Sequence, residues 1–529
     1  MVEMDPAAKV ELDALELVKP IDEATERGDS DIQQFYRDKT LFLTGTTGFI
    51  GKQLLEKLFR SCEIKKAFVL IRPKNGTPTK ERLREMLNDP VFEPVRKKKP
   101  DMNSRIVCVE GDVADLRLGI SSTDWDTIVE EVDIIFHVAA TVRFDEPIRM
   151  ATFINVRGTR EALALGKACK KLKSFVHVST AYCHTTSSRV GGEVLEQFYK
   201  SPLPPDTMLN MAETLSNETL ENISSSLTSG WPNTYTFTKA VSEELVRVES
   251  KNLPVCIVRP SIVLSTYREP VPGWLDMSCV YGPSGIVLGI GLGVVRVLMV
   301  DNTAKISFVP VDFVNNATIA AGWETALKKT EDTKLYNISS TNCSVTFRHI
   351  STPMGQSENR KTVCASTKSM WYPFLIETNN TLVYWILSWF MHYIPAYIVD
   401  GAMNVLDIKK PQGLKSFIKV YTKFDKMSSL YSYFLTNEWI FDETNLKSLW
   451  QRMSDADKTI YNFDIKTIDW DHMTCMWVLG VRKYIIKDGL KDTKKANTRN
   501  MWFKFANYLV VLVYLFIIWK IITWVCYVF

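Results

Sequence analysis

Residues 40–51 read TLFLTGTTGFIG, and this stretch gives the strongest indication of the fold. An apolar run at residues 40–44 leads into three glycines with GxxGxxG spacing, and an amphipathic helical pattern continues to Ser61. A strand, a glycine turn and a helix in this order typically bind the pyrophosphate of a dinucleotide at the helix N-terminus. The stretch that we assign to cofactor binding is Gly45, Thr46, Thr47, Gly48, Phe49, Ile50 and Gly51.

Each glycine has its own expected role. A tight turn needs Gly45, where the backbone approaches the cofactor. Gly48 lets main-chain amides close on the pyrophosphate, and Gly51 lets the helix pack against the sheet.

Similar apolar runs recur along the chain and alternate with helical patterns. The runs are residues 67–71, 105–109, 133–138, 175–178 and 255–258, and the helical patterns include residues 153–172 and 234–248. Continuous apolar strands separated by helices indicate a parallel sheet covered on both faces. The sequence therefore predicts an α/β fold, a doubly wound parallel Rossmann sheet at residues 39–350. It follows a polar N-terminal tail at residues 1–38 and precedes a helical, aromatic-rich C-terminal domain at residues 351–500.

The overall composition excludes several classes of protein. The chain has 529 residues, 46% apolar and 23% charged, which suits two to four globular domains. A net charge of +4 argues against nucleic-acid binding. The ten cysteines include no CxxC pair, so we expect no metal site and a reducing compartment.

The C-terminal residues 505–529 read FANYLVVLVYLFIIWKIITWVCYVF and predict a membrane anchor. A spanning helix needs about 20 apolar residues, and the basic residues that precede this run favour the cytosolic side. Alternatively, Lys520 keeps the helix in the membrane interface. A second apolar stretch, residues 384–397, fits a core helix, an acyl-chain wall or a membrane-dipping helix, and Pro395 limits how far a straight helix can run there.

Several strand ends carry further candidates for cofactor binding. Arg72, possibly aided by Lys74, stands where NAD-preferring sites carry an acidic residue, which favours the 2′-phosphate of NADP(H). Asp112 follows the third strand and could accept from the adenine amino group. The other candidates at strand ends are Val113, Ala139, Ala140 and Thr141.

A YxxxK pair supplies the proton-handling groups. Tyr235 and Lys239 are four residues apart and so lie on one face of a helix. A nearby ammonium lowers the pKa of a phenol and makes it a better acid. The fifth strand ends in Ser179 and Thr180, one of which could hold the substrate carbonyl.

The glycine turn, the strand-end hydroxyl and the YxxxK pair, in this order, resemble the extended short-chain dehydrogenase/reductase superfamily. The resemblance narrows to the alcohol-forming fatty acyl-CoA reductases, on the stretches TGTTGFIGKQLLEKLFR, VLIRPK, FHVAATVRFDE, HVSTAY, YTFTKA, VRPSIV and EPVPGWLD. It implies that Thr180, Tyr235 and Lys239 are catalytic and that Pro260 and Ser261 flank the nicotinamide. It also implies that two NADPH convert a long-chain fatty acyl-CoA into a primary alcohol, through an aldehyde and with release of CoA.

Alternatives remain at this point. They are an aldehyde-forming acyl-CoA reductase, a sterol dehydrogenase or a sugar-nucleotide enzyme of the same superfamily, and a non-catalytic membrane protein that binds NADPH. The expected location is an intracellular membrane with the catalytic domain in the cytosol, first the endoplasmic reticulum, then a peroxisome or lipid droplet.

Two insertions interrupt the alternation of strands and helices. The basic run at residues 96–99 is either solvated or in contact with the coenzyme phosphates, and residues 185–232 are expected to form a substrate lid. The sequence gives neither the oligomeric state nor the acyl chain length.

Overall fold

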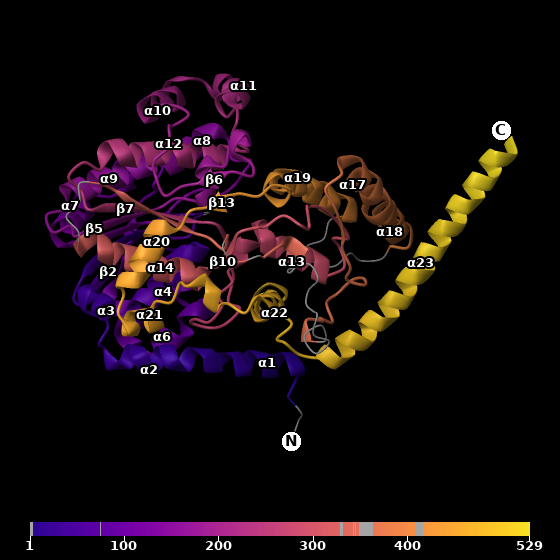
Figure 1. The fold of residues 1–529 in the computed structure, drawn as a ribbon, viewed down its shortest axis with the longest axis horizontal. Helices are drawn as coiled ribbons and strands as arrows, with labels where there is room; N and C mark the ends of the chain where they lie inside the picture. Colours follow the sequence, from indigo (N-terminus) through magenta and orange to yellow (C-terminus); the bar gives the residue numbers. More distant parts are fainter. Residues whose placement is uncertain are drawn as a thin grey trace.

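The computed structural model describes residues 4–74, 76–327, 332–341, 343, 345–348, 363–407 and 416–528. Its centre is a seven-stranded parallel sheet in the order β11-β7-β5-β4-β1-β2-β3 (Figure 1). This order is that of a doubly wound sheet, so the predicted fold class is confirmed. The strands are β1 (Thr40–Thr44), β2 (Lys66–Ile71), β3 (Ile106–Glu110), β4 (Ile134–His137), β5 (Ser174–Val178), β7 (Val255–Pro260) and β11 (Lys334–Ile338).

Helices cover both faces of this sheet, because successive strand residues point to opposite sides. Leu41 and Leu43 enter one hydrophobic cluster, and Phe42 between them enters the other. One face carries α3 (Asp31–Tyr36), α4 (Phe49–Ser61) and α14 (Val311–Leu327); the other carries α7 (Ser122–Glu131), α9 (Gly158–Ala168) and α12 (Thr234–Glu249).

The N-terminal residues are not a free tail. They form α1 (Pro6–Ala14), α2 (Lys19–Arg27) and α3, and α1 and α2 lie along the lower edge of the molecule in Figure 1. Tyr36 is fully buried and donates to the carbonyl of Ile319, 2.9 Å away. The prediction of a tail is wrong, because these residues form helices that pack on the rest of the protein. A few apolar residues spaced along mostly polar helices are enough for this packing.

The C-terminal region is mostly helical, as predicted, but it does not form a separate body. Helices α20 (Thr444–Arg452) and α21 (Asp455–Ile460) pack against the sheet domain, and β13 (Ile440–Phe441) pairs with β6 (Glu193–Val194). Helix α22 (Trp470–Gly480) follows them. The predicted boundary at residues 350 and 351 lies outside the described residues.

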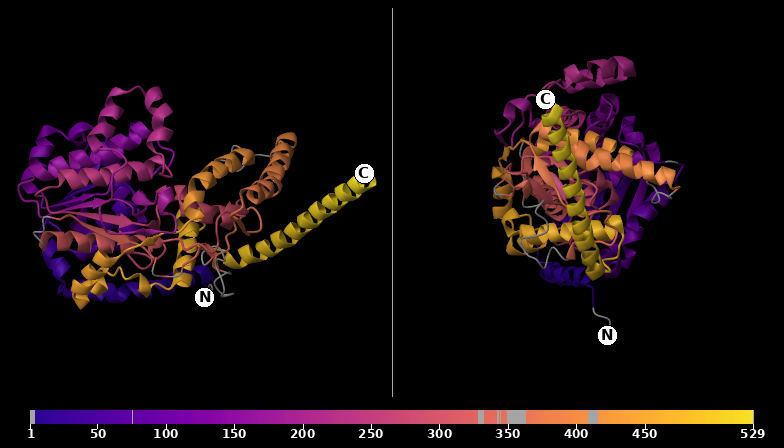
Figure 2. Two further views of the ribbon diagram at one scale, coloured as in Figure 1. Left: turned by 45° about the horizontal axis from the view of Figure 1, so that its top comes forward. Right: turned by 90° about the vertical axis from the view of Figure 1, so that its right-hand side faces the viewer.

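Two long apolar helices lie at the other end of the molecule from the sheet (Figures 1 and 2). One runs through α17 (Thr381–Ser388), the π-helical turn η9 (Trp389–Tyr393) and α18 (Ile394–Val405). The other, α23 (Thr493–Val528), begins twelve residues before the predicted membrane segment. Both are long and apolar enough to cross a membrane.

Pro395 does not end the first of these helices. Proline cannot donate to the carbonyl one turn earlier, and a π-helical turn precedes it in the chain. Arg296 Nη1 donates to the carbonyl of Met391 at 3.1 Å. The carbonyl that the proline leaves free is therefore satisfied by a side chain.

Both insertions have defined positions in the fold, and the basic run lies at the surface, as the first of its two predicted roles requires. The basic run belongs to α6 (Glu93–Lys98), where Lys98 pairs with Asp22 at 2.9 Å and Lys99 pairs with Glu63 at 2.6 Å. Helices α10 (Pro205–Thr214) and α11 (Asn217–Leu227) pack on α8 (Ile148–Thr152), at the top of Figure 1. The lid role of residues 185–232 stays a prediction.

Candidate active site

The glycine turn after β1 has the geometry of a dinucleotide cradle. Gly45 has φ +76°, and a Cβ there would lie 2.7 Å from the backbone nitrogen of Ala139. A Cβ at Gly51 would lie 2.3 Å from the carbonyl oxygen of Gly45. Both positions therefore exclude any side chain, and Gly48 is the residue at which α4 begins. The free N-terminal amides of α4 face the turn, where an anionic pyrophosphate is favoured.

This turn lies at the point where the strand order reverses, between β1 and β4, which is where ligands bind in open α/β sheets. The Thr44 hydroxyl accepts from the amides of Val138 at 3.2 Å and Ala139 at 3.1 Å, which holds the two strand ends together. The predicted residues Ala139, Ala140 and Thr141 therefore lie beside the glycine turn.

Buried hydroxyls without a hydrogen-bond partner mark the same edge of the sheet. They are Thr46 Oγ1 in the turn, Ser179 Oγ after β5 and Ser261 Oγ after β7. A buried polar atom without a partner costs about 1–3 kcal/mol, and a bound ligand can satisfy it. The glycine cradle and these hydroxyls together fit a dinucleotide.

Two arginines, Arg72 and Arg82, lie together at the end of β2, and the sequence predicted a role for Arg72 alone. Arg72 is half exposed, and its Nη1 lies 3.5 Å from Asp112 Oδ2. Arg82, on α5 (Thr79–Leu87), donates to the carbonyl oxygen of Arg72. Burial and the neighbouring Arg72 lower the pKa of Arg82. Arg82 was missed because it lies ten residues after Arg72, and only the fold of α5 onto the strand end brings them together.

The side chain of Asp112 lies beside Arg72, in the turn after β3. Its other oxygen accepts from the amide of Ala114 at 3.0 Å, which fixes the turn after β3. The carbonyl of Val113 packs against Gly158, where a Cβ would lie 3.0 Å away. Both residues thus shape the turn that follows β3.

Tyr235 and Thr180 meet at the carboxyl ends of the central strands. Tyr235 lies in the first turn of α12, which Asn233 caps by accepting from the amide of Thr236 at 2.9 Å. Burial raises the pKa of Tyr235 above its ordinary value, and a hydrogen bond from the Thr180 side chain opposes this rise. Thr180 Oγ1 also lies 3.4 Å from the carbonyl oxygen of Pro260. This last contact places Pro260 beside the Thr180 hydroxyl.

Lys239 lies one turn further along α12, on the face it shares with Tyr235. Its ammonium donates to the carbonyl of Val178 at 2.8 Å, at the end of β5. Burial lowers the pKa of Lys239 to about 8, and Glu243 acts in the opposite direction. The expected lowering of the Tyr235 pKa by Lys239 is not seen, because burial of the phenol dominates and the ammonium is bound to a carbonyl.

A buried ion pair lies beneath Lys239. Glu243 binds Arg259 through both oxygens, at 2.9 and 2.6 Å, and Arg259 also donates to the carbonyls of Leu195 and Gln197 at 3.0 Å each. Cys183, His184 and Glu243 are close enough to share a cation. The guanidinium already neutralises that carboxylate, so the group fits an ion pair better than a metal site.

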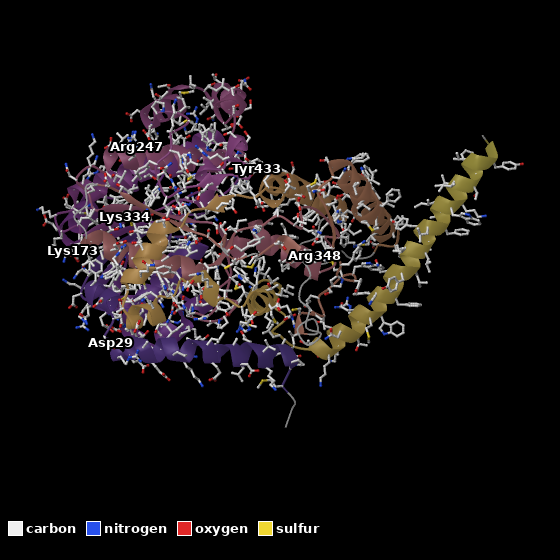
Figure 3. The ribbon with its side chains drawn as sticks, viewed as in Figure 1. Asp29, Lys173, Arg247, Lys334, Arg348 and Tyr433 are labelled. Carbon is white, nitrogen blue, oxygen red and sulfur yellow. The ribbon has the colours of Figure 1, made fainter. Side chains whose placement is uncertain are left out.

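An aromatic wall faces Tyr235 and comes from a distant part of the chain. The ring of Phe144 stacks on Tyr235, with centroids 6.0 Å apart. Tyr431 and Phe434, near the end of α19 (Phe417–Leu435), contact Phe144 at 5.2 and 5.3 Å. Tyr433, labelled in Figure 3, donates to the carbonyl of Thr185 at 2.9 Å. Helix α19 therefore lies against the site, and only its aromatic content signalled this in the sequence.

The segment EPVPGWLD, residues 269–276, holds α4 in place. Both Glu269 oxygens lie 2.6 Å from Lys57 Nζ, and Arg60 adds a bond of 2.7 Å. Asp276 pairs with Lys52 at 2.5 Å, and Trp274 stacks on Phe49. This segment thus fixes the helix whose N-terminus faces the pyrophosphate.

The same segment crosses α22 at very close range. Gly273 has φ +76°, and a Cβ on Gly480 would lie 1.8 Å from the Gly273 carbonyl oxygen. Two glycines at this crossing bring the C-terminal region against the cofactor half of the molecule.

Comparisons with known proteins agree with this geometry. The NAD-binding profile described as "Male sterility protein" matches residues 43–318, and a second profile of that description matches residues 391–488. The chain is 37% identical to "Fatty acyl-CoA reductase wat" of Drosophila melanogaster over 489 residues, which covers 92% of each chain. It is 33% identical to "Fatty acyl-CoA reductase 2" of Homo sapiens over 502 residues, which covers 93% of each chain.

Solved structures share the fold at lower identity. The reductase (R) domain of a non-ribosomal peptide synthetase from Mycobacterium tuberculosis superimposes with a TM-score of 0.55 and 18% identity, covering 87% of this chain and 97% of that one. The terminal R domain of the myxalamid pathway gives a TM-score of 0.51 and 20% identity, covering 84% and 91%. These similarities support the sheet-and-helix architecture alone.

Proposed function

The chain belongs to the fatty acyl-CoA reductase family, and from this premise we propose that it uses NADPH to reduce long-chain fatty acyl-CoA to primary alcohol. The family and the nicotinamide-binding fold make it an oxidoreductase of acyl-CoA. The choice of NADPH, the alcohol product and a cytosol-facing site on an intracellular membrane, first the endoplasmic reticulum, are parts of the proposal.

The contact that carries the proposal is the one between Thr180 and Tyr235. Two hydroxyls hydrogen-bonded to each other at the carboxyl ends of the strands can also bind one carbonyl oxygen. The ordinary pKa of a phenol is about 10, so Tyr235 is protonated at neutral pH, as a general acid must be, and burial raises its pKa further.

The residues present divide the chemistry between them. Bound NADPH would supply the hydride that attacks the acyl carbonyl carbon. Thr180 holds the carbonyl oxygen, and Tyr235 donates a proton to the oxyanion as it develops. The Lys239 ammonium is bound to the Val178 carbonyl, and this position suits a bond to the nicotinamide ribose.

Loss of the thiol completes the first reduction. The hemithioacetal would return its hydroxyl proton to the Tyr235 phenolate and lose CoA as a thiolate, which takes a proton from water, to leave an aldehyde. The aldehyde carbonyl would then bind the same two hydroxyls, a second NADPH would supply the hydride, and Tyr235 would again donate the proton that gives the alcohol. The aromatic wall of Phe144, Tyr431 and Phe434 suits the first methylenes of the chain, each worth about 0.8 kcal/mol when buried.

The test is the ratio of cofactor to thiol. Purified full-length protein with palmitoyl-CoA should oxidise two NADPH for each CoA released, with hexadecanol as the product by mass spectrometry. A ratio of one, with free hexadecanal accumulating, would show an aldehyde-forming enzyme instead. NADPH oxidation without thiol release would favour a dehydrogenase of another substrate.

The variant Tyr235→Phe tests the acid directly. It should lower kcat by about 100-fold or more, since a positioned general acid contributes about 100- to 10,000-fold. NADPH affinity should stay within about twofold, because the phenol oxygen is not part of the glycine cradle. Normal turnover by the variant would rule out Tyr235 as the acid. Absence of turnover in both proteins would leave a non-catalytic NADPH-binding role.

A further inference from the structure

The helix formed by α17, η9 and α18 has two opposite faces. Four residues spaced by four, Ser388, His392, Ala396 and Asp400, are buried against the protein. In the same 25-residue span only 17% of the most apolar window is buried. The helix is therefore long and apolar enough to cross a membrane, although one side of it packs on protein.

The buried side is held by polar contacts. His392 Nε2 accepts from the amides of Arg296 at 3.0 Å and Val297 at 3.3 Å. Asp400 accepts from the Ser416 hydroxyl at 2.7 Å and from the amide of Ile418 at 3.1 Å. The middle and the end of the helix are thus both bonded to the protein body, which argues against a helix that crosses the bilayer with lipid on all sides.

The opposite side is exposed and apolar. Its exposed residues are Leu382, Val383, Trp385, Ile386, Trp389, Phe390, Tyr397, Ile398, Val399, Val405 and Leu406. Ile398 is 65% exposed and Trp385 is 61% exposed. A soluble protein rarely leaves so continuous an apolar surface in water, and tryptophan and tyrosine are enriched where a protein meets a membrane interface.

This surface continues onto α23. Tyr514 of α23 donates to the carbonyl of Phe390 at 3.2 Å, and the two rings meet edge to face at 6.1 Å. Tyr514 is nine residues past Phe505, or about 14 Å along the helix axis. One leaflet contributes about 15 Å of hydrocarbon, half of a core of about 30 Å. The contact therefore falls within the first leaflet that α23 enters.

We propose that the exposed face of α17, η9 and α18 is a lipid-docking surface that lies in one leaflet of a phospholipid bilayer beside α23 and does not cross it. The occupant is lipid because the surface is continuous with the apolar run of α23, whose most apolar window has no buried residue. Figures 1 and 2 show both helices at the same end of the molecule, away from the sheet.

The docked helix is also linked to the active site. Tyr384 donates to Asp425 of α19 at 2.9 Å, and Tyr393 donates to its other oxygen. The far end of α19 carries Tyr431 and Phe434, which form the aromatic wall of the site. Docking thus holds α19 between the bilayer and the catalytic tyrosine.

Photo-crosslinking of the full-length protein tests this surface. Benzoylphenylalanine replaces Trp385 or Ile398, and each variant is reconstituted in vesicles of radiolabelled phosphatidylcholine and irradiated. The same replacement at Phe516 of α23 is the lipid-exposed reference, and at Val248 on α12, which is 46% exposed, it is the solvent reference.

We expect lipid adducts at both test positions within about threefold of Phe516 and about tenfold above Val248. Labelling at the level of Val248 would overturn the proposal, because the face would then lie in water. Crosslinks between two copies of the chain, without lipid adducts, would also overturn it and assign the face to a dimer interface. Because the readout is a covalent adduct and not turnover, it does not depend on the reaction that the enzyme performs.

Discussion

The basic pair at the end of β2 gives the sharpest prediction about cofactor choice. We expect Arg72→Ala and Arg82→Ala each to weaken NADPH binding while leaving NADH binding nearly unchanged. Arg72 lies where a 2′-phosphate is recognised in such sheets, and Arg82 packs onto its carbonyl from α5. NADH lacks the phosphate and so gains nothing from either guanidinium.

The size of the effect follows from the exposure of the pair. A hydrogen bond to a charged group contributes about 1.5–3 kcal/mol, and a charge pair at 4 Å contributes about 1 kcal/mol in water. Arg72 is 52% exposed and already pairs with Asp112, so we take the lower value for its hydrogen bond to the phosphate. About 1.5 kcal/mol predicts a loss of about tenfold in NADPH affinity for each variant. The double variant should lose less than the product, because both groups would bind one phosphate.

The assay is a titration of NADPH and of NADH into purified full-length protein, followed by cofactor fluorescence. Arg84→Ala is the matched control: Arg84 stands on the same helix, two residues after Arg82, and pairs with Glu81 at 2.6 Å instead. Equal weakening of the two cofactors, or an equal effect of Arg84→Ala, would refute the phosphate role.

Three further predictions concern the site and its supports. The kcat/KM for acyl-CoA should fall as pH rises through about 8. Burial lowers the pKa of Lys239 to about 8, so the ammonium loses its charge above that pH. A flat profile to pH 9.5, about 1.5 units higher, would contradict this. Glu269→Gln should lower the free energy of unfolding by about 3–5 kcal/mol in urea titrations, since it leaves the buried Lys57 without its anion, and a change under about 1 kcal/mol would show that the cluster adds little. Gly480→Ala should lower the thermal midpoint, with a cost of about 1–3 kcal/mol, because its Cβ would overlap the Gly273 carbonyl; an unchanged midpoint would mean that the crossing can open freely.

The local patterns of the chain predicted the sheet and one side of the site. The spacing of apolar residues and the composition of each run identify the strands, because parallel strands buried on both faces are continuous apolar runs in the sequence. The glycine turn could be recognised because only glycine fits at Gly45 and Gly51, and that restriction arises from neighbours close in the chain or on the adjacent strand. Tyr235 and Lys239 share a face because four residues make about one helical turn.

What the sequence could not provide is every contact made between distant segments. Arg82 joins Arg72, and Glu269 binds α4 from 212 residues away. Tyr431 and Phe434, near the end of α19, contact Phe144, which stacks on Tyr235. The N-terminal helices and the two faces of α17 to α18 were also decided by packing, since polar composition does not show which few apolar residues are buried. Local periodicity determined the elements and the reacting groups, whereas the cofactor supports, the aromatic wall and the lipid-facing surface depend on which elements the tertiary fold brings together.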